Sequence, residues 1–338
     1  MAWIWDKKSK TEAQVKNYIS LDAFPKIQGY DFADDFNKKD FLKQYKNMGF
    51  QGSNLGIAME ILNEMLKNKV PIYLSFTGNM ISSGNRELIT YLVKNNLIKG
   101  IVTTASSLEE DIIKCIKPFY LGTFDIKGSY LLDNLIGRIG NIFVPANHYL
   151  YLERFLNEIL PILYSTQKKT NNIISSHELT KELGIFIEKN TYTKENHESS
   201  FLYWASKNNI PVSVPGITDG SLGDILVFFK RNNPEFKIDS TGDNVKLTKL
   251  LMNEETAGCI ILGGGISKHF LLNSAIFRDG FDYSIYLTTS SEFDGSDSGG
   301  NQEEAISWAK IKPKARKVKV VADATLTFPL LISSIEKV

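Results

Sequence analysis

The sequence predicts an α/β fold built on a doubly wound, mostly parallel sheet with helices on both of its faces. Short apolar runs recur along the last two thirds of the chain and break into Gly, Asn, Asp or Thr. Most of these runs are apolar throughout, as expected for parallel strands covered on both faces. Helical patterns alternate with the runs, which is typical of such sheets. We therefore expect strands at residues 71–76, 98–104, 141–145, 211–216, 259–263, 283–289 and 318–323.

The helices between these strands are predicted from apolar side chains that recur every three or four residues. Ile57, Ile61 and Met65 belong to such a stripe in a helix over 54–67, with Ser53 or Asn54 as its N-cap. Similar stripes predict helices over 84–96 and 149–164. We expect one domain over 51–338, preceded by a helical N-terminal appendage over 1–50.

Composition and charge exclude several classes of protein. Lys plus Arg number 39 and Asp plus Glu number 38 among 338 residues, so the formal net charge is +1. Dedicated binders of nucleic acid or anionic membranes usually carry a strong basic excess, so we expect neither partner. Apolar runs are all shorter than the roughly 18 residues that span a membrane. The first apolar stretch is too short for a signal peptide, so we expect a cytoplasmic protein.

The chain has few groups that suggest a disulfide or a metal. Cys115 and Cys259 stand in apolar runs without a CxxC motif, so we expect buried, reduced thiols. The acidic segment 292–300 lacks the spacing of an EF-hand loop. We therefore expect no metal site.

Ligands of doubly wound sheets bind beyond the carboxyl ends of the strands, which directs attention to the residues that follow each run. Small residues over 77–84 open a helix, where free N–H groups suit a phosphate or form an ordinary turn. Glu109, Glu110 and Asp111 are expected in the first turn of the next helix. There they complement the helix dipole or hold a ribose hydroxyl or a cation. Asp323 is expected to cap the last helix or to accept a hydrogen bond from a ligand.

Two further turns combine glycines with polar side chains. Asp219 and Asp224 flank the glycine-rich turn 218–224, and Gly263 to Gly265 precede His269. Three successive glycines after a buried strand indicate close approach of backbone or ligand, although the GxGxxG spacing is absent. The remaining histidines stand on polar or helical stretches and are expected at the surface: His148, His177 and His197.

The densest group of polar residues precedes the last strand. Three acids over 292–297 are followed by a helix that carries Trp308 and Lys310. Carboxylates pair with ammonium groups and an aromatic face binds a cation, so this combination suits a polyamine. Lys310 has apolar neighbours, and partial burial would free its amine for attack on an imine. The run of lysines and arginine over 312–319 is expected on a solvated strand edge.

Together these segments resemble the deoxyhypusine synthase family. The matching strings are NMISSG at 79–84, EED at 109–111, TDGSLGD at 218–224, GGG at 263–265 with KH at 268–269, EFDGSDSG at 292–299, SWAK at 307–310 and ADA at 322–324. They occur in the family's order and cover about residues 50–330. The resemblance implies a Rossmann-like fold, a homotetramer built as a dimer of dimers, and active sites at a dimer interface.

The resemblance also implies an NAD-dependent aminobutyl transferase. NAD oxidises spermidine to an imine, and the 4-aminobutyl group moves to an enzyme lysine with release of 1,3-diaminopropane. The group then passes to one lysine of the translation initiation factor 5A precursor, where reduction gives deoxyhypusine. Lys310 is implied as the imine lysine, and His269 as a further catalytic residue.

Position by position, the resemblance implies two sets of binding residues. The polyamine would contact Glu109, Glu110, Asp224, His269, Gly295, Ser296, Asp297, Glu304 and Trp308. NAD would contact Asn79, Met80, Ile81, Ser82, Thr104, Ala105, Ser106, Glu110, Asp219, Gly264, Thr289, Ser290, Asp323 and Ala324. The chain departs from the family pattern at Gly78, where Ser is frequent, at Ser106-Ser107 and Gly300-Asn301, and at Ala309, where Gly usually precedes the lysine.

Three other functions remain open at this stage. A homospermidine synthase-like enzyme would pass the aminobutyl group to putrescine, and no residue separates it from the first interpretation. An inactive NAD-binding regulatory paralogue would have lost the reactive lysine or the pocket acids, which are present here. A plain NAD dehydrogenase acting on an amine would accumulate NADH.

One local feature bears on the geometry of Lys310. On a regular helix, Glu303 would share a face with Lys310 and Glu304 would not. We expect the helix to end before Lys310, or the lysine to reach round from its last turn, and Pro313 permits such an early end.

Overall fold

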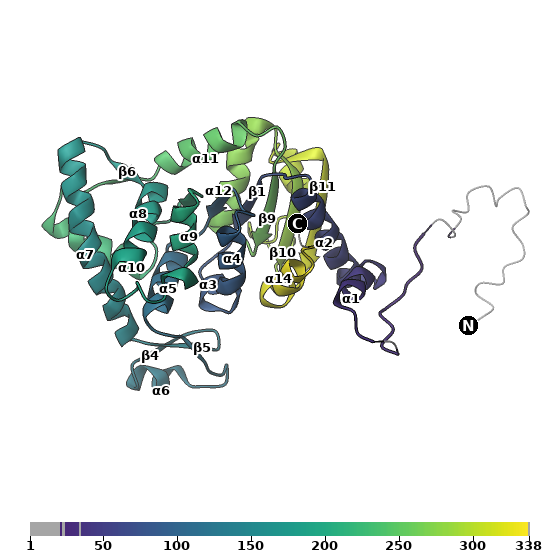
Figure 1. The fold of residues 1–338 in the computed structure, drawn as a ribbon, viewed down its shortest axis with the longest axis horizontal. Helices are drawn as coiled ribbons and strands as arrows, with labels where there is room; N and C mark the ends of the chain where they lie inside the picture. Colours follow the sequence, from purple (N-terminus) through teal and green to yellow (C-terminus); the bar gives the residue numbers. More distant parts are fainter. Residues whose placement is uncertain (1–20, 22–23, 34, 337–338) are drawn as a thin grey trace, which may run out of the picture.

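A six-stranded parallel sheet forms the centre of the molecule (Figure 1). The computed structural model describes residue 21, residues 24–33 and residues 35–336. The strand order is β11-β10-β9-β1-β2-β7, and every neighbouring pair runs parallel. The strands are β1 (Ile72–Ser75), β2 (Gly100–Val102), β7 (Val212–Ser213), β9 (Gly258–Leu262), β10 (Phe281–Thr288) and β11 (Ile311–Val321). The predicted α/β class is confirmed, and six of the seven predicted strands lie in this sheet.

Helices cover both faces of this sheet. Alternate residues of β1 and β9 point to opposite sides, so Leu74 and Ile260 join one buried cluster and Tyr73 and Ile261 join the other. The first cluster packs against α2 (Phe50–Lys67), α4 (Asn85–Lys94), α5 (Ala105–Ile116), α7 (Asn147–Thr170), α8 (Ser176–Lys189), α9 (Phe201–Lys207), α10 (Ser221–Asn232) and α14 (Ala324–Ser333). The second packs against α11 (Gly242–Met252), α12 (Gly265–Ala275) and α13 (Gln302–Ser307). The sheet is therefore doubly wound.

The edge strand β11 is covered by α2. Gln51 Oε1 accepts a hydrogen bond from Val321 N at 2.7 Å, and Asn54 Nδ2 donates to Lys319 O at 3.0 Å. These bonds satisfy backbone groups that an edge strand otherwise leaves open to another chain. The predicted cap at Ser53 or Asn54 is wrong: α2 begins at Phe50, after Gly49 in the left-handed region at φ 91°.

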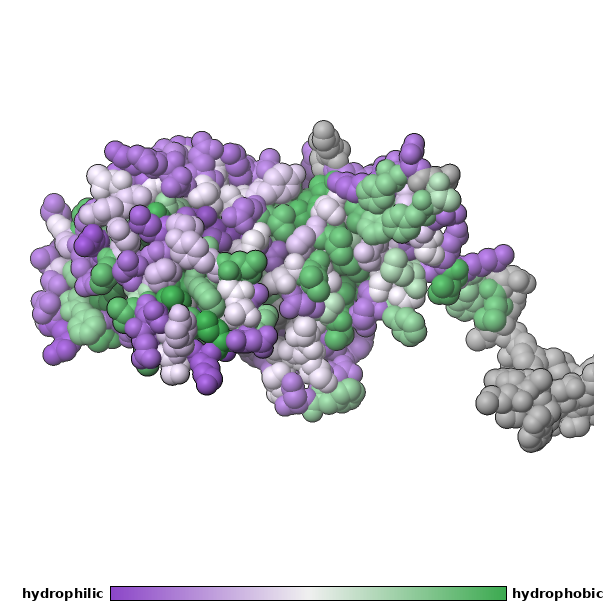
Figure 2. Space-filling model, turned by 90° about the horizontal axis from the view of Figure 1, so that it is seen from below, coloured by the Kyte–Doolittle hydropathy of each residue, from purple (hydrophilic) through white to green (hydrophobic). Residues whose placement is uncertain are grey.

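Residues 141–145 do form a strand, but not in the central sheet. β5 (Ile142–Pro145) lies between β3 (Tyr120–Leu121) and β4 (Ile136–Ile139) in a small antiparallel sheet. The prediction of a parallel strand was wrong because Gly140, at φ 59°, allows a tight turn that folds β4 directly onto β5. With α6 (Gly128–Asp133), this sheet forms the lower edge of the view in Figure 1. Figure 2 looks onto that face and shows apolar side chains at the surface among polar ones.

Several short elements complete the fold. α3 (Asn79–Ser82) follows β1, and a parallel pair of strands, β6 (Ile174–Ser175) and β8 (Ile238–Asp239), lies apart from the main sheet. 3₁₀ turns occur at η4 (Tyr45–Asn47), η5 (His197–Ser199) and η6 (Ile276–Arg278). No helix of the described residues is long and apolar enough to cross a membrane.

The expected division at residue 50 stays a prediction. α1 (Lys38–Gln44) contributes Leu42 to the main core, and residues 1–20 of the expected appendage lie outside the described residues. The expectation for the two cysteines is confirmed, since Cys115 and Cys259 are both buried and free.

Candidate active site

All six loops that were singled out lie at one edge of the central sheet. Each follows the carboxyl end of a strand, and parallel strands place those ends together. Along this edge the loop after β7, which carries Asp219, is followed by the loops after β2, β1, β9, β10 and β11. We describe the site residues as one group around β7, β2 and β1 and a second group around β9, β10 and β11, which adjoin where β1 pairs with β9.

Three carboxylates gather in the first group. Glu109 Oε1 accepts a hydrogen bond from Leu222 N at 2.8 Å, which brings the Asp219–Asp224 loop against α5. Burial raises the pKa of Glu109, the N–H groups of Leu222 and Ser221 lower it, and the charges of Asp219 and Asp224 raise it further. The three acids thus form an anionic cluster on the side of the sheet that β7 borders.

Glu110 joins this cluster to α3. Ser82 Oγ donates to Glu110 Oε2 at 2.5 Å, so the segment 79–82 lies beside α5. Burial raises the pKa of Glu110 to about 8. The side chains of Met80 and Ile81 are buried in the core, and the carbonyl of Ile81 accepts a hydrogen bond from Lys114 Nζ at 2.9 Å.

The position of the acids corrects the prediction for this helix. α5 begins at Ala105, so Glu109, Glu110 and Asp111 lie in its second turn, where the helix dipole does not explain them. Asp111 is structural: its carboxylate accepts from Arg86 Nε at 2.7 Å and from Ser200 Oγ at 2.6 Å. This buried pair fixes α5 and with it the two glutamates.

Gly78 and Ser106, two of the departures from the family pattern, are neighbours in space. A Cβ atom on Gly78 would lie 2.2 Å from Ser106 Oγ. Ser106 Oγ lies 2.9 Å from Thr104 Oγ1, which in turn accepts from Gly78 N at 3.1 Å. The hydroxyl of Ser106, near the start of α5, therefore lies in the space that a side chain at residue 78 would fill.

The second group is centred on α12 and the acidic loop 292–300. Gly264 abuts Ser298, because a Cβ atom on Gly264 would lie 2.3 Å from Ser298 Cα. His269 Nδ1 lies 3.0 Å from Asp297 Oδ1. The geometry brings these predicted site residues together, while Gly295, Ser296 and Thr289 stand exposed nearby in sequence.

Two lysines that sequence reasoning did not assign hold the acidic loop. Lys268 Nζ donates to Gly300 O at 2.8 Å and also to Asp297 O. Lys319 Nζ donates to Gly299 O at 2.6 Å. Lys268 precedes His269 in the KH string of the sequence analysis. Its role could not be predicted there, because a lysine that binds backbone carbonyls has no recognisable sequence pattern.

Lys268 also locates Lys310 and Glu304. Burial lowers the pKa of Lys268. The negative charges of Asp297 and Glu304 oppose this shift, and the positive charges of Lys319 and Lys310 add to it. Three of the predicted polyamine and imine residues thus affect the charge of Lys268, namely Asp297, Glu304 and Lys310, and His269 joins them through Asp297.

The backbone around Lys310 confirms that the helix ends early. α13 ends at Ser307, Lys310 N donates to Ala305 O at 2.9 Å, and Ala309 N donates to Ile306 O at 2.9 Å. This is a Schellman motif with Ala309 in the left-handed region at φ 55°. Lys310 is half-buried in the single chain, and the Trp308 side chain is 64% exposed.

Asp323 adopts its structural role, and Ser290 has only a local bond. Asp323 Oδ1 accepts from Thr325 N at 2.6 Å as the N-cap of α14, with Ala324 as the first helical residue. Ser290 N donates to Thr288 Oγ1 at 3.1 Å. Both residues lie at the expected edge of the sheet.

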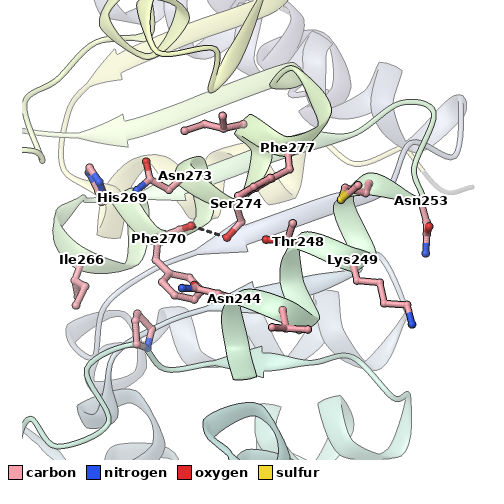
Figure 3. Close-up of a pocket in the computed structure, with 14 residues that line it drawn as sticks. Asn244, Thr248, Lys249, Asn253, Ile266, His269, Phe270, Asn273, Ser274 and Phe277 are labelled. Carbon is pink, nitrogen blue, oxygen red and sulfur yellow. Dashed lines mark hydrogen bonds between the residues drawn. The ribbon is translucent and has the colours of Figure 1, made fainter. Parts of the chain in front are cut away.

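A cavity of about 780 Å³ lies between α11 and α12 (Figure 3). His269 lines it from the second group, and Pro215 from the base of the Asp219 loop. Ile266, Phe270 and Phe277 give it apolar walls. Within the part of the chain that the structure describes, no hydrogen bond or ion pair links the first group to the second, and both groups border this cavity.

Of the three histidines expected at the surface, one is buried, and His177 and His197 are half-buried. His148 is buried, and burial lowers its pKa. His177 is half-buried and lies beside Asp243, with Nδ1 3.0 Å from Oδ1. Both stand at the starts of helices that pack on the core, a placement that their polar neighbours in sequence do not reveal.

Comparisons with known proteins identify the family. The family model described as deoxyhypusine synthase matches residues 40–335. A protein of Methanocaldococcus jannaschii named "Probable deoxyhypusine synthase" is 44% identical over 319 residues, covering 92% of this chain and 96% of that protein. A "Deoxyhypusine synthase" of Musa acuminata is 40% identical over 347 residues, covering 94% and 90%.

A solved structure agrees with the sequence comparisons. A crystal structure from Entamoeba histolytica, provisionally named a deoxyhypusine synthase, has a TM-score of 0.60 and is 27% identical, covering 91% of this chain and 96% of that one. Similarity therefore extends over nearly the whole length of the compared proteins and includes every loop of the candidate site. The chain belongs to the deoxyhypusine synthase family.

Proposed function

We propose that this chain transfers the 4-aminobutyl group of spermidine to a lysine of the translation initiation factor 5A precursor, with NAD as its cofactor. The single observation that carries the proposal is the cluster of Glu109, Asp219 and Asp224 beside Glu110. Burial raises the pKa of Glu109 and the charges of Asp219 and Asp224 raise it further, so ionising these acids together requires a bound countercharge. A polycation such as spermidine supplies that countercharge.

The residues of the sheet edge fit NAD. Ribose hydroxyls are commonly held by carboxylates; Glu110 lies beside the segment 79–82, and Asp219 lies close to the neighbouring Glu109. Gly263 and Gly265 have open space around them, so backbone can approach a cofactor closely there. When bound, NAD accepts a hydride from spermidine and later returns it to the product.

The proposed role of Lys310 is to hold the aminobutyl group between donor and acceptor. Its neutral amine attacks the imine carbon of oxidised spermidine, and the C–N bond to 1,3-diaminopropane breaks as that amine takes up a proton. The acceptor lysine then attacks the Lys310 imine, which frees the Lys310 amine. Hydride return reduces the new imine, so no net oxidant is consumed.

Exposure of the second group supports a multimeric enzyme. Trp308 is 64% exposed in the single chain, whereas hydride transfer requires a site from which water is excluded. We propose the homotetramer, a dimer of dimers, in which a neighbouring protomer covers Trp308 and Lys310. We place the enzyme in the cytoplasm, where its protein acceptor is made.

The test measures the fate of label from spermidine. Purified enzyme receives NAD, spermidine labelled in the aminobutyl group, and either the factor 5A precursor or putrescine. Label entering the protein supports the proposal, and label entering putrescine alone would overturn it in favour of the homospermidine synthase-like reaction. Net NADH accumulation in the presence of the protein acceptor would instead indicate a dehydrogenase.

A second measurement tests the lysine. Borohydride should trap an aminobutyl adduct on the parent enzyme and none on Lys310→Arg. Lys314→Arg, at an exposed position of the adjoining strand, is the matched control and should trap as much adduct as the parent. Equal trapping on Lys310→Arg would contradict the assignment.

A further inference from the structure

Asp243 is a buried carboxylate outside both groups of site residues. Its side chain is 1% exposed and lies at the start of α11. Asp243 Oδ1 accepts from His177 N at 2.9 Å, and Oδ2 accepts from Val214 N at 3.1 Å and from Ser176 Oγ. One side chain thus joins the first residues of α8 and α11 to the end of β7. A buried carboxylate is retained only where such bonds compensate its lost hydration.

The bond to Val214 lies at the base of a site loop. Val214 directly follows β7, and the next ten residues lead through Asp219 to Asp224. β7 has only two residues and pairs only with β2, at the edge of the sheet. A strand this short gives its carboxyl end few ladder bonds, so the direction of the loop depends on further contacts. Ser176 Oγ supplies one, accepting from Val214 N at 2.8 Å.

The other end of the same loop is held in an equivalent way. Glu109 Oε1 accepts from Leu222 N at 2.8 Å, and Gly220 fits beside it because it lacks a Cβ atom. Two buried carboxylates therefore hold the ends of this segment: Asp243 binds Val214 N, and Glu109 binds Leu222 N. Glu109 belongs to the proposed binding site, whereas Asp243 touches none of the residues assigned to NAD or spermidine.

We infer that Asp243 is a positioning residue for both ligands, acting through Val214 on the loop that carries Asp219 and Asp224. The inference rests on the proposed function, because it takes Asp219 as a contact of NAD and Asp224 as a contact of spermidine. Losing the anchor moves both carboxylates together. Small displacements of a positioning element weaken ligand binding strongly.

The test compares Asp243→Asn with the parent enzyme. An amide keeps the volume of the side chain but has one acceptor oxygen where three or more donors converge. We expect the dissociation constants of NAD and of spermidine, each measured by calorimetry, both to rise by about tenfold or more. We expect the spermidine KM to rise, with kcat at saturation within about twofold of the parent value, because Lys310 lies in the other group.

Asp239→Asn is the matched control. Asp239 lies just before α11 and accepts a hydrogen bond from Thr241 N at 2.8 Å, but it makes no hydrogen bond to Val214. Asp239→Asn should bind NAD and spermidine with the same dissociation constants as the parent, even where its melting temperature is lower. Ser176→Ala is the second test, because it removes the other anchor of Val214 and should raise the same two constants.

The outcomes separate this inference from the proposed function. A parent enzyme without transferase activity overturns the proposed function. An active parent, with a folded Asp243→Asn or Ser176→Ala variant that melts earlier but binds both ligands as the parent does, shows a purely structural role and overturns the inference. If Asp243→Asn does not fold, the binding constants of Ser176→Ala decide.

Discussion

Gly78 and Ser106 share one small space at the carboxyl ends of β1 and β2. The two positions are 28 residues apart in sequence, yet a Cβ atom on Gly78 would lie 2.2 Å from Ser106 Oγ. A serine at residue 78 therefore fits beside Ser106 only if one of the two residues shifts. The chain carries the Gly–Ser combination, which places the hydroxyl on α5, beside Thr104.

This shared space predicts the behaviour of a pair of substitutions. Gly78→Ser should lower the free energy of unfolding by about 1–3 kcal/mol, because overpacking forces α3 away from α5. Gly78→Ser combined with Ser106→Gly should recover most of that loss. Denaturant unfolding of the four proteins of this cycle gives the coupling. Gly84→Ser, at a position with open space and a negative φ, is the control and should change little. Equal losses in the single and double variants would contradict the shared space.

A second residue, Glu110, should make stability depend on pH. Burial raises its pKa from 4.5 to about 8, so the folded chain binds a proton that the unfolded chain has released. Stability from this group is complete below about pH 4.5 and is lost as the pH rises through about 8. Glu110→Gln should therefore gain stability relative to the parent between these limits, with an upper bound of about 5 kcal/mol.

Denaturant midpoints at pH 5 and pH 9 measure this effect. The difference between Glu110→Gln and the parent should grow with pH, while Glu153→Gln, at an exposed position of α7, should keep a constant difference. A Glu110→Gln difference that is flat, or that shrinks with pH, is inconsistent with the buried, protonated side chain.

At the scale of elements, the end of α13 determines where Lys310 points. The Schellman motif places Ala309 in the left-handed region, where an L side chain is strained and glycine is usual. Ala309→Gly should therefore raise the free energy of unfolding by about 0.5–1 kcal/mol. Ala305→Gly, inside the same helix, should lower it, because that residue is buried and helical. Destabilisation by Ala309→Gly would show that the motif is held by other contacts.

The elements that sequence could predict are those whose signal is local. Continuous apolar runs identified β1, β2, β7, β9, β10 and β11, because only strands covered on both faces need them. β5 was predicted as a strand but assigned to the wrong sheet, because an apolar run does not indicate which strand it will pair with. The start of α2 was missed because Gly49, rather than a polar side chain, ends the preceding turn.

The same distinction holds for the candidate site. Loops after the strands could be predicted to meet, because parallel strands share one carboxyl edge. Lys268, Lys319 and Asp243 could not, because each binds backbone groups that are distant in sequence. The division of the predicted residues into two groups also had no local signal, since it follows from the strand order.

At the scale of the whole molecule, that division requires an explanation. Asp224 belongs to the group around β7 and Lys310 to the group around β10 and β11, and Lys310 is only half-buried in the single chain. A reaction through an imine needs both in one water-poor site. A symmetric dimer resolves this difficulty when the first group of one protomer faces the second group of its partner.

Mixed assemblies test this arrangement. Asp224→Asn and Lys310→Arg should each be nearly inactive alone. Co-expressed and assembled at random, they should recover about a quarter of the parent activity. Half of the dimers are then mixed, and each mixed dimer has one intact site of two. Two copies of the same variant, co-expressed and purified in the same way, provide the control. Activity no greater than the sum of the separate variants would mean that each site is built within one chain. A group other than the partner protomer would then have to shield Trp308 from water.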